Sequence, residues 1–163
     1  MADVFSNLSD NLRQSLTSLG ITSPTPVQAE VIPRILEGEN VLFESETGTG
    51  KTFAYLLPLI NKLESIDDHQ RVRIIVVAPT FELASQINSA CKSVTNHKSA
   101  LMIGGAPLKR QIETLKEKPE IIIGTAARLV EQAFTLEDPH CPHGRPIYTV
   151  ISREKLFELV KRT

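Results

Sequence analysis

The chain has 163 residues, a net charge of -1, 41% hydrophobic residues and 23% charged residues. These values are typical of one globular domain with a real core, and they exclude an intrinsically disordered chain. The near-neutral charge also argues against a uniformly basic nucleic-acid binder, although a local basic face stays open.

Signals for localisation are few in this sequence. The first residues, MADVFSNLSD, lack the basic stretch and apolar run of a signal peptide. No apolar run is long enough to span a bilayer. The two cysteines, Cys91 and Cys141, offer no disulfide framework. We therefore expect a protein of the cytoplasm or nucleus that is not secreted, has reduced thiols and has no membrane partner.

The chain begins with two predicted helices. Residues 9–20 form the first, which Ser9 or Asp10 can cap and Gly20 can end. Residues 21–38 begin as an extended piece held by prolines and continue as the second helix. Its predicted inward-facing residues are Val27, Ile32 and Ile35.

From residue 40 onward, apolar strands alternate with helices. The predicted strands are residues 40–45, 71–79, 99–105, 119–125 and 146–151. The predicted helices are residues 52–65, 81–94, 106–117, 126–134 and 153–162. This alternation predicts an α/β fold with an open, mostly parallel sheet and helices on both faces. Residues 71–79 are almost continuously apolar, as expected for a strand that is covered on both faces.

The segment SETGTGKT, residues 45–52, lies between a predicted strand and a predicted helix. Gly48 and Gly50 allow the backbone to wrap a phosphate group, and the N–H groups at the start of the helix point toward the anion. Lys51 would reach the β- and γ-phosphates, and the Thr52 hydroxyl would ligate magnesium. The spacing therefore predicts a nucleotide-binding loop.

Two alternatives to that reading of the loop stay open. The strict G-x-x-x-x-G-K-[ST] pattern has glycine where this chain has Ser45, so the segment could be an ordinary strand-to-helix turn. Among nucleotide-binding proteins, the other alternative is a small P-loop kinase, which the motifs on either side disfavour.

Five segments in this order resemble the first RecA-like domain of DEAD-box RNA helicases, over about residues 5–128. They are GITSPTPVQ (20–28, the Q motif), SETGTGKT (45–52, motif I), PTFELASQ (79–86, motif Ia), IGG (103–105, the Gly-Gly turn) and GTAAR (124–128, motif Ib). The chain departs from the family pattern at Ile21, where an aromatic usually stacks on adenine, and at Phe81, where an arginine usually contacts RNA. Phe5 stands where the family carries an upstream aromatic.

The resemblance implies that residues 1–128 form a RecA-like domain that binds ATP or ADP with Mg²⁺ and holds single-stranded RNA by its phosphates. Gln28 would read the adenine edge through its amide. The other implied nucleotide-binding residues are Ser45, Thr47, Gly48, Thr49, Gly50, Lys51 and Thr52, with Thr52 on the magnesium. The implied RNA-binding residues are Pro79, Thr80, Glu82, Gly104, Gly105, Thr125 and Arg128. A plainer alternative is that Thr80 and Glu82 cap a helix, the glycines only turn the chain, and Arg128 is a surface charge.

The D-E-A-D motif of that family is missing from this sequence. Its acids hold magnesium and position the attacking water, and they should follow the strand predicted at residues 146–151. Ser152, Arg153, Glu154 and Lys155 stand there instead. The S-A-T motif and the second RecA-like domain are also missing, although a parent protein could supply that domain. We expect little or no ATP hydrolysis or unwinding by this chain alone, the alternative being an active RNA-dependent ATPase in which Glu46 or Glu154 replaces the acid.

The segment HCPHGRP, residues 140–146, and the strand and helix predicted after it resemble the C-terminal end of MutL-type mismatch-repair proteins. Residues 129–163 would then be a strand-helix tail packed on the same sheet. The sheet would be truncated or hybrid at its C-terminal end, and the chain a chimera, natural or engineered, joined near residues 125–129. Cys141 and His143 would supply part of a metal site, or they are vestigial loop residues, because a closed zinc site needs four ligands. A mismatch-repair-type metal-binding module and a fold without activity are further alternatives.

Overall fold

The computed structural model describes residues 3–65 and 72–134. Its elements in chain order are η1 (Val4–Asn7), α1 (Asp10–Ser18), α2 (Pro26–Glu37), α3 (Lys51–Leu63), β1 (Ile74–Ala78), α4 (Phe81–Val94), β2 (Ser99–Met102), α5 (Leu108–Lys116), β3 (Ile121–Thr125) and α6 (Ala126–Phe134). Every helix and strand predicted between residues 9 and 134 is present, except the strand at residues 40–45.

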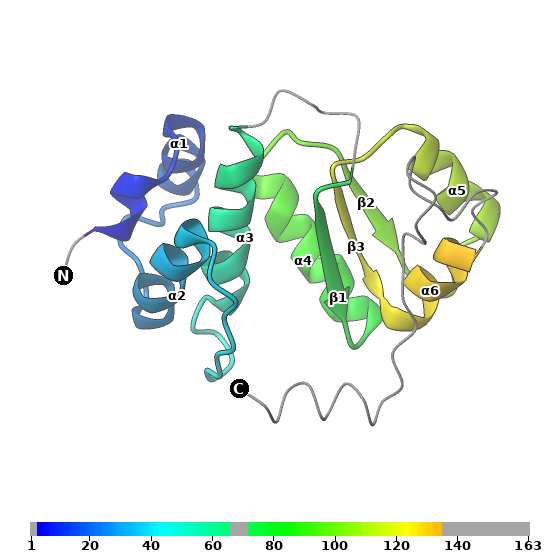
Figure 1. Cartoon of the computed structure of the whole chain (residues 1–163), viewed down its shortest axis with the longest axis horizontal. Coiled ribbons are helices and arrows are strands. Elements are labelled where there is room, and N and C mark those ends of the chain that lie inside the picture. Colours follow the sequence, from blue (N-terminus) through cyan, green and yellow to red (C-terminus); the bar gives the residue numbers. More distant parts are fainter. Residues whose placement is uncertain (1–2, 66–71, 135–163) are drawn as a thin grey trace.

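The three strands of the described sheet are parallel and lie in the order β1–β3–β2. Ala78 of β1 pairs with Thr125 of β3, and Met102 of β2 pairs with Gly124, so all three strands end at the same edge. Helix α4 packs on one face of the sheet, and α5 and α6 lie on the other (Figure 1). The predicted α/β class, with a parallel sheet and helices on both faces, is confirmed.

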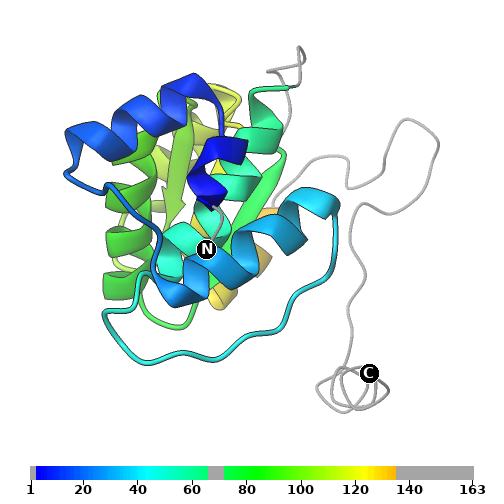
Figure 2. The ribbon, with the colours of Figure 1, turned by 90° about the vertical axis from the view of Figure 1, so that its left-hand side faces the viewer.

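The remaining helices form a layer beyond α4. Helix α3 contacts α4 on one side and α2 on the other, and α1 also contacts α4. Figure 2 shows α1 and α2 nearest the viewer, on the side of the molecule away from α5 and α6. The core joins these layers, and its fully buried large side chains include Leu12, Leu16, Ile32, Leu56, Leu57, Ile60, Ile121 and Ile123.

Local sequence signals explain where the first two helices begin and end. The Ser9 hydroxyl accepts a hydrogen bond from the N–H of Leu12, and α2 begins with a capping box between Thr25 and Gln28. Gly38, in the left-handed region at a φ of 88°, ends α2. The inward face of α2 differs in part from the prediction. Ile32 is fully buried as predicted, but Val27 and Ile35 are half-buried and Val31 is buried instead.

The prediction of a strand at residues 40–45 is wrong, because these residues form neither a helix nor a strand. Leu42 is 92% exposed, and residues 39–50 form a long open loop between α2 and α3 (Figure 2). A strand exists only where a neighbour supplies hydrogen bonds to its backbone, and no described strand pairs with this segment. The apolar pattern of the segment could not reveal that lack of a partner.

The prediction that both faces of β1 are covered is also wrong for the described residues. Ile74, Val76 and Ala78 are buried, but Ile75 is 63% exposed and Val77 is 59% exposed. The reason is position, since β1 lies at one edge of the described sheet and α5 and α6 pack against β2 and β3 instead. The central strand β3 has the predicted deep burial.

Several sequence predictions lie outside the described residues. They include the strand at 146–151, the helix at 153–162, the candidate ligands Cys141 and His143, and Glu154. Within residues 3–65 and 72–134, no helix has both the length and the apolar character that crossing a membrane requires.

Candidate nucleotide and RNA site

Gln28 is buried beside the predicted phosphate loop, with only 3% of its surface exposed. Its Nε2 donates a hydrogen bond of 3.1 Å to the carbonyl of Gly50, and its Oε1 accepts one of 3.0 Å from the N–H of Thr25. The side chain predicted to read adenine thus joins the start of α2 to the start of α3. One N–H of the amide is engaged with the loop before any ligand is considered.

The predicted phosphate loop turns through two glycines in the left-handed region. Gly48 has a φ of 81° and Gly50 a φ of 86°. Helix α3 then begins at Lys51 without a side-chain cap. No side chain therefore caps the backbone N–H groups of its first turn, and such uncapped groups favour an anion.

Lys51 folds back across the loop that precedes it. Its Nζ donates to the carbonyl of Ser45 and, at 2.7 Å, to the carbonyl of Glu46. The hydroxyl of Thr49 donates to the same Glu46 carbonyl at 2.9 Å and is hydrogen-bonded to the hydroxyl of Ser45. The ammonium group is thus held by backbone carbonyl oxygens of the loop itself.

Thr52, the predicted magnesium ligand, is hydrogen-bonded to Tyr55 one turn later. Burial raises the pKa of Tyr55, and this hydrogen bond partly offsets the rise. A threonine hydroxyl fits a magnesium shell, which prefers oxygen ligands. The described residues, however, contain no group of three or more His, Cys, Asp or Glu side chains that could hold a metal.

The predicted RNA-binding residues lie together at the carboxyl edge of the sheet. Pro79, Thr80 and Glu82 follow β1, Gly104 and Gly105 follow β2, and Thr125 and Arg128 stand at the end of β3 and the start of α6. Because the strands are parallel and in register, these three loops meet at one edge. In Figure 1 the start of α3 lies toward the same lower end of the view as the ends of β1 and β3.

Two of the predicted side chains at this edge also make contacts within the protein. The Thr80 hydroxyl accepts a hydrogen bond of 3.3 Å from the N–H of Leu83, so Thr80 caps α4 as the plainer alternative held. Arg128 is not a free surface charge, since its side chain is 14% exposed and pairs with Glu131 at 2.9 Å. Phe81, in place of the usual arginine, is 54% exposed.

Phe5 and Ile21, the two positions compared with family aromatics, lie near each other in the structure. Both line a small cavity of about 250 Å³ between η1, α1 and the segment that leads to α2. Phe5 is buried, with 5% of its surface exposed, and belongs to the core. Phe5 is therefore a core residue that also forms part of the wall of this cavity.

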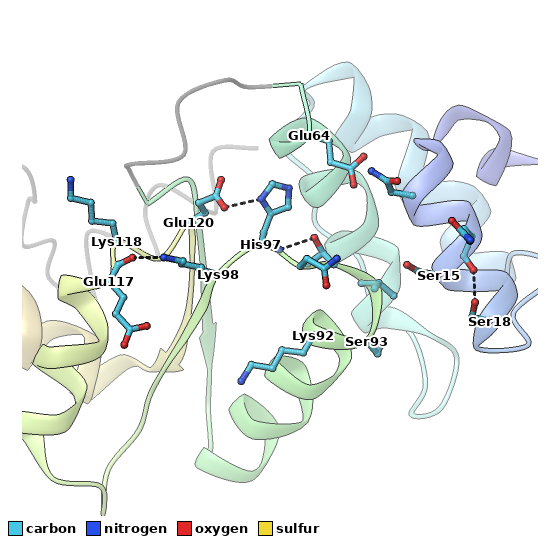
Figure 3. Close-up of a pocket in the computed structure, with 15 residues that line it drawn as sticks. Ser15, Ser18, Glu64, Lys92, Ser93, His97, Lys98, Glu117, Lys118 and Glu120 are labelled. Atoms are coloured by element: carbon cyan, nitrogen blue, oxygen red, sulfur yellow. Dashed lines mark hydrogen bonds and ion pairs between the residues drawn. The ribbon is translucent and has the colours of Figure 1, made fainter.

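A larger cavity, of about 970 Å³, lies at the amino ends of β2 and β3, opposite the predicted site (Figure 3). In it His97 and Glu120 point toward one another, with 2.7 Å between Nδ1 and Oε2. Their side chains are 15% and 8% exposed. Sequence reasoning missed this pair, because a His and a Glu 23 residues apart meet only when two strands begin side by side.

Comparison with protein families gives one match over most of the chain, to the DEAD/DEAH box helicase family at residues 25–143. That match runs past residue 128, where the helicase resemblance was predicted to end. None of the relatives named here is a mismatch-repair protein, so the MutL-type resemblance of the tail stays a prediction.

Individual relatives agree with the family match. The DEAD-box ATP-dependent RNA helicase CshA of Bacillus cereus is 43% identical over 128 residues, which are 76% of this chain and 24% of that protein. The ATP-dependent RNA helicase DRS1 of Lodderomyces elongisporus is 38% identical over 140 residues, 80% of this chain and 20% of that protein. The chain thus spans about a quarter of the length of these relatives.

Solved structures of related proteins share this fold. A DEAD box protein from Methanococcus jannaschii has a TM-score of 0.71 and 33% identity, over 78% of this chain and 35% of that one. The DEAD-box helicase Mss116, bound to single-stranded RNA and UDP-BeF, has a TM-score of 0.73 and 30% identity, over 78% of this chain and 28% of that one. Sequence and fold agree, and the chain belongs to the DEAD/DEAH box helicase family.

Proposed function

We propose that this domain binds adenine nucleotide with Mg²⁺ and contacts the backbone of single-stranded RNA, with little or no hydrolysis or unwinding on its own. The observation that carries the nucleotide part is the start of α3. There an uncapped helix end, two left-handed glycines and the ammonium of Lys51 converge on one loop. Such a constellation favours a polyphosphate anion over the alternative of an ordinary turn.

The RNA part is supported by the meeting of the loops after β1, β2 and β3 at one sheet edge. Exposed backbone in such loops suits phosphate contacts that do not depend on base sequence. Mss116, a related helicase of the same fold, was solved with single-stranded RNA and a nucleotide analogue. We propose the same two classes of ligand here, in a protein of the cytoplasm or nucleus.

Weak hydrolysis is proposed because the sequence lacks the D-E-A-D acids and the described residues hold no carboxylate cluster for a metal. A second RecA-like domain from a parent protein would be needed for unwinding. The competing candidate is an ATPase that uses Glu46, whose side chain is exposed in the phosphate loop. Single-turnover assays with Mg²⁺ and RNA separate the two. Phosphate release that is lost in Glu46→Gln would establish the competing candidate.

Nucleotide binding is tested by calorimetry with ADP and a non-hydrolysable ATP analogue. Lys51→Ala should weaken binding at least tenfold, because a charge-assisted contact to phosphate is lost. Lys62→Ala, at the other end of α3, removes the same charge from an exposed position and should bind as the wild type does. Equal affinities for Lys51→Ala and wild type would remove the nucleotide proposal.

We also propose that the tail, residues 129–163, packs on the same sheet. In support, its described start belongs to α6, which contacts β3, and the neighbouring strand β1 has an uncovered apolar face. Parallel strands are normally covered on both faces, so we expect another segment to cover this apolar face of β1. Whether Cys141 and His143 bind metal is a separate question, which elemental analysis of protein purified without chelator answers.

A further inference from the structure

We infer that Gln111 and Arg128 are positioning residues that hold the Gly104–Gly105 turn in the shape that meets the RNA backbone. The inference rests on the proposed function, since it concerns the loop after β2 at the RNA edge. It assigns a role to Gln111, which the motifs do not include, and it changes the role of Arg128 from a direct RNA contact to an indirect one.

The two side chains converge on the same pair of backbone carbonyls. Nε2 of Gln111 donates to the carbonyl of Ile103 at 2.9 Å and to that of Ala106 at 3.2 Å. Arg128 donates from Nε to Ile103 at 3.2 Å and from a terminal nitrogen to Ala106 at 3.4 Å. A carbonyl oxygen has two lone pairs, so each oxygen accepts both bonds.

These carbonyls are the ones immediately before and after the Gly-Gly pair. The turn is exposed, and Gly105 has a φ of 82°, so little else in its own sequence restrains it. A Cβ at either glycine would meet nothing within 4 Å, so the space on that side of the turn is open. The four hydrogen bonds to the flanking carbonyls restrain the shape of the turn. Its open surface and backbone N–H groups are thereby held in place for a ligand.

Gln111 carries a signature of a role other than packing. It is 4% exposed, and its Oε1 is the one buried side-chain nitrogen or oxygen atom among the described residues without a hydrogen-bond partner. Burying an unpaired amide oxygen is unfavourable, so an apolar side chain would suit stability better at this position. If the amide were flipped, Oε1 instead of Nε2 would face the carbonyl oxygens of Ile103 and Ala106, and the two oxygens would repel it. Only the N–H groups of Gln111 explain why an amide is there.

The side chain of Arg128 is held against the turn by its hydrogen bonds to the same two carbonyls. Three of its N–H groups are used within the protein, two on the turn and one on Glu131 at 2.9 Å. Glu131 lies one helical turn further along α6 and holds the guanidinium against the turn. An arginine placed in this way transmits its effect to RNA through the shape of Gly104 and Gly105.

Salt dependence distinguishes positioning from direct contact. An arginine that neutralises one phosphate of a single strand contributes about 0.7 to the slope of log K against log salt concentration. We propose measuring the binding of labelled oligouridine by fluorescence anisotropy at several salt concentrations, with a non-hydrolysable ATP analogue present. Arg128→Met and Gln111→Met should each weaken RNA binding about fivefold to tenfold and leave the slope unchanged. The affinity for the ATP analogue should not change in either variant.

NMR relaxation supplies a readout that does not need RNA. In both variants the backbone order parameters of Gly104, Gly105 and Ala106 should fall from about 0.85 to below about 0.6, because the turn loses two of its four restraints. The matched controls are Gln14→Met and Arg13→Met on the exposed surface of α1, which should change neither measurement.

The outcomes separate this inference from the proposed function. A slope that falls by about 0.7 in Arg128→Met would show a direct phosphate contact and overturn the positioning role of Arg128. Unchanged order parameters at the turn would overturn the role of both residues. If the wild type binds no RNA while the order parameters fall as expected in the variants, the hold on the turn stands and the proposed RNA function fails.

Discussion

The amide of Gln28 and the carbonyl of Gly50, 22 residues apart, are joined by a hydrogen bond of 3.1 Å. It fixes the start of α3 against the start of α2, although the loop between them has no regular structure. The helical end of the phosphate loop is therefore held by a side chain from another helix. Nucleotide affinity should depend on this contact as much as on the residues that face the phosphates.

Gly50→Ala tests that contact directly. A Cβ at Gly50 would overlap the amide of Gln28, and the φ of 86° is strained for alanine. We expect the free energy of unfolding to fall by about 2–4 kcal/mol, the sum of strain and overpacking, together with a loss of nucleotide affinity. Gly48→Ala shares the left-handed backbone, with a φ of 81°, but meets no neighbour within 4 Å. Urea unfolding should therefore show a loss of only about 1 kcal/mol for Gly48→Ala. Equal losses for the two variants would contradict the importance of the Gln28 contact.

Gly124 in β3 marks a close approach between two strands. A Cβ there would overlap the carbonyl of Met102, its partner in β2, and lie 2.8 Å from the Met102 Cβ. Gly124→Ala should therefore force β2 away from β3 and lower the free energy of unfolding by about 1–3 kcal/mol, as overpacking does. Gly104→Ala is the control, because its Cβ would meet nothing within 4 Å. Thermal unfolding of both variants would decide the matter, and a Gly124→Ala protein as stable as wild type would disprove the close packing.

Cys91 should be unreactive in the folded protein. It is fully buried in α4, and burial raises the pKa of its thiol to about 11. In a Cys141→Ser background, we expect an alkylating reagent at pH 8 to modify the single thiol only after urea unfolding. Fast modification of the folded protein would show that α4 opens locally.

The same thiol predicts how stability changes in alkali. The raised pKa means that the folded state keeps its proton where the unfolded state loses it, so this contribution is complete below the unfolded pKa. Stability should fall as the pH rises from about 9 toward 11. Cys91→Ala, which has no proton to lose, should show a shallower decline in urea midpoint over that range. An equal decline in both proteins would point to other groups.

The uncovered face of β1 provides a test of the tail. Ile75→Thr keeps a β-branched side chain but removes apolar surface. If residues 129–163 cover this face, the substitution should cost about 1–2 kcal/mol in the whole chain and close to nothing in a chain that ends at residue 134. The free energy of unfolding from urea titrations gives both values. Equal costs in the two chains would mean that the tail leaves Ile75 exposed.

Several elements could be read from the sequence because their signals are local. Helix α4 begins and ends where the pattern predicted, at Phe81 and Val94, since Thr80 caps it and its apolar residues recur with helical spacing. The loop motif likewise predicted a helix from Thr52, and α3 begins one residue earlier, at Lys51. Such signals involve residues within one or two turns of each other, so no knowledge of distant neighbours is needed.

The site was predicted in outline but not in its internal contacts. The order of strands and helices placed the loops after β1, β2 and β3 at one edge, because parallel strands end together. The hydrogen bonds from Gln111 and Arg128 to the turn join residues as many as 25 positions apart. They correspond to no motif in the sequence. Side-chain hydrogen bonds between separate elements become readable only once those elements are packed.

By itself, the sequence determined the class of the fold, the positions of most helices and strands, and the family to which the chain belongs. Periodicity, caps and glycine positions act over a few residues and are written directly in the chain. Only the tertiary structure decided that residues 40–45 have no strand partner, that β1 lies at an edge of the described sheet, and that Gln28 binds the phosphate loop. The physical reason is that strand pairing and burial belong to pairs of distant segments, so an apolar run predicts a strand but not its neighbour.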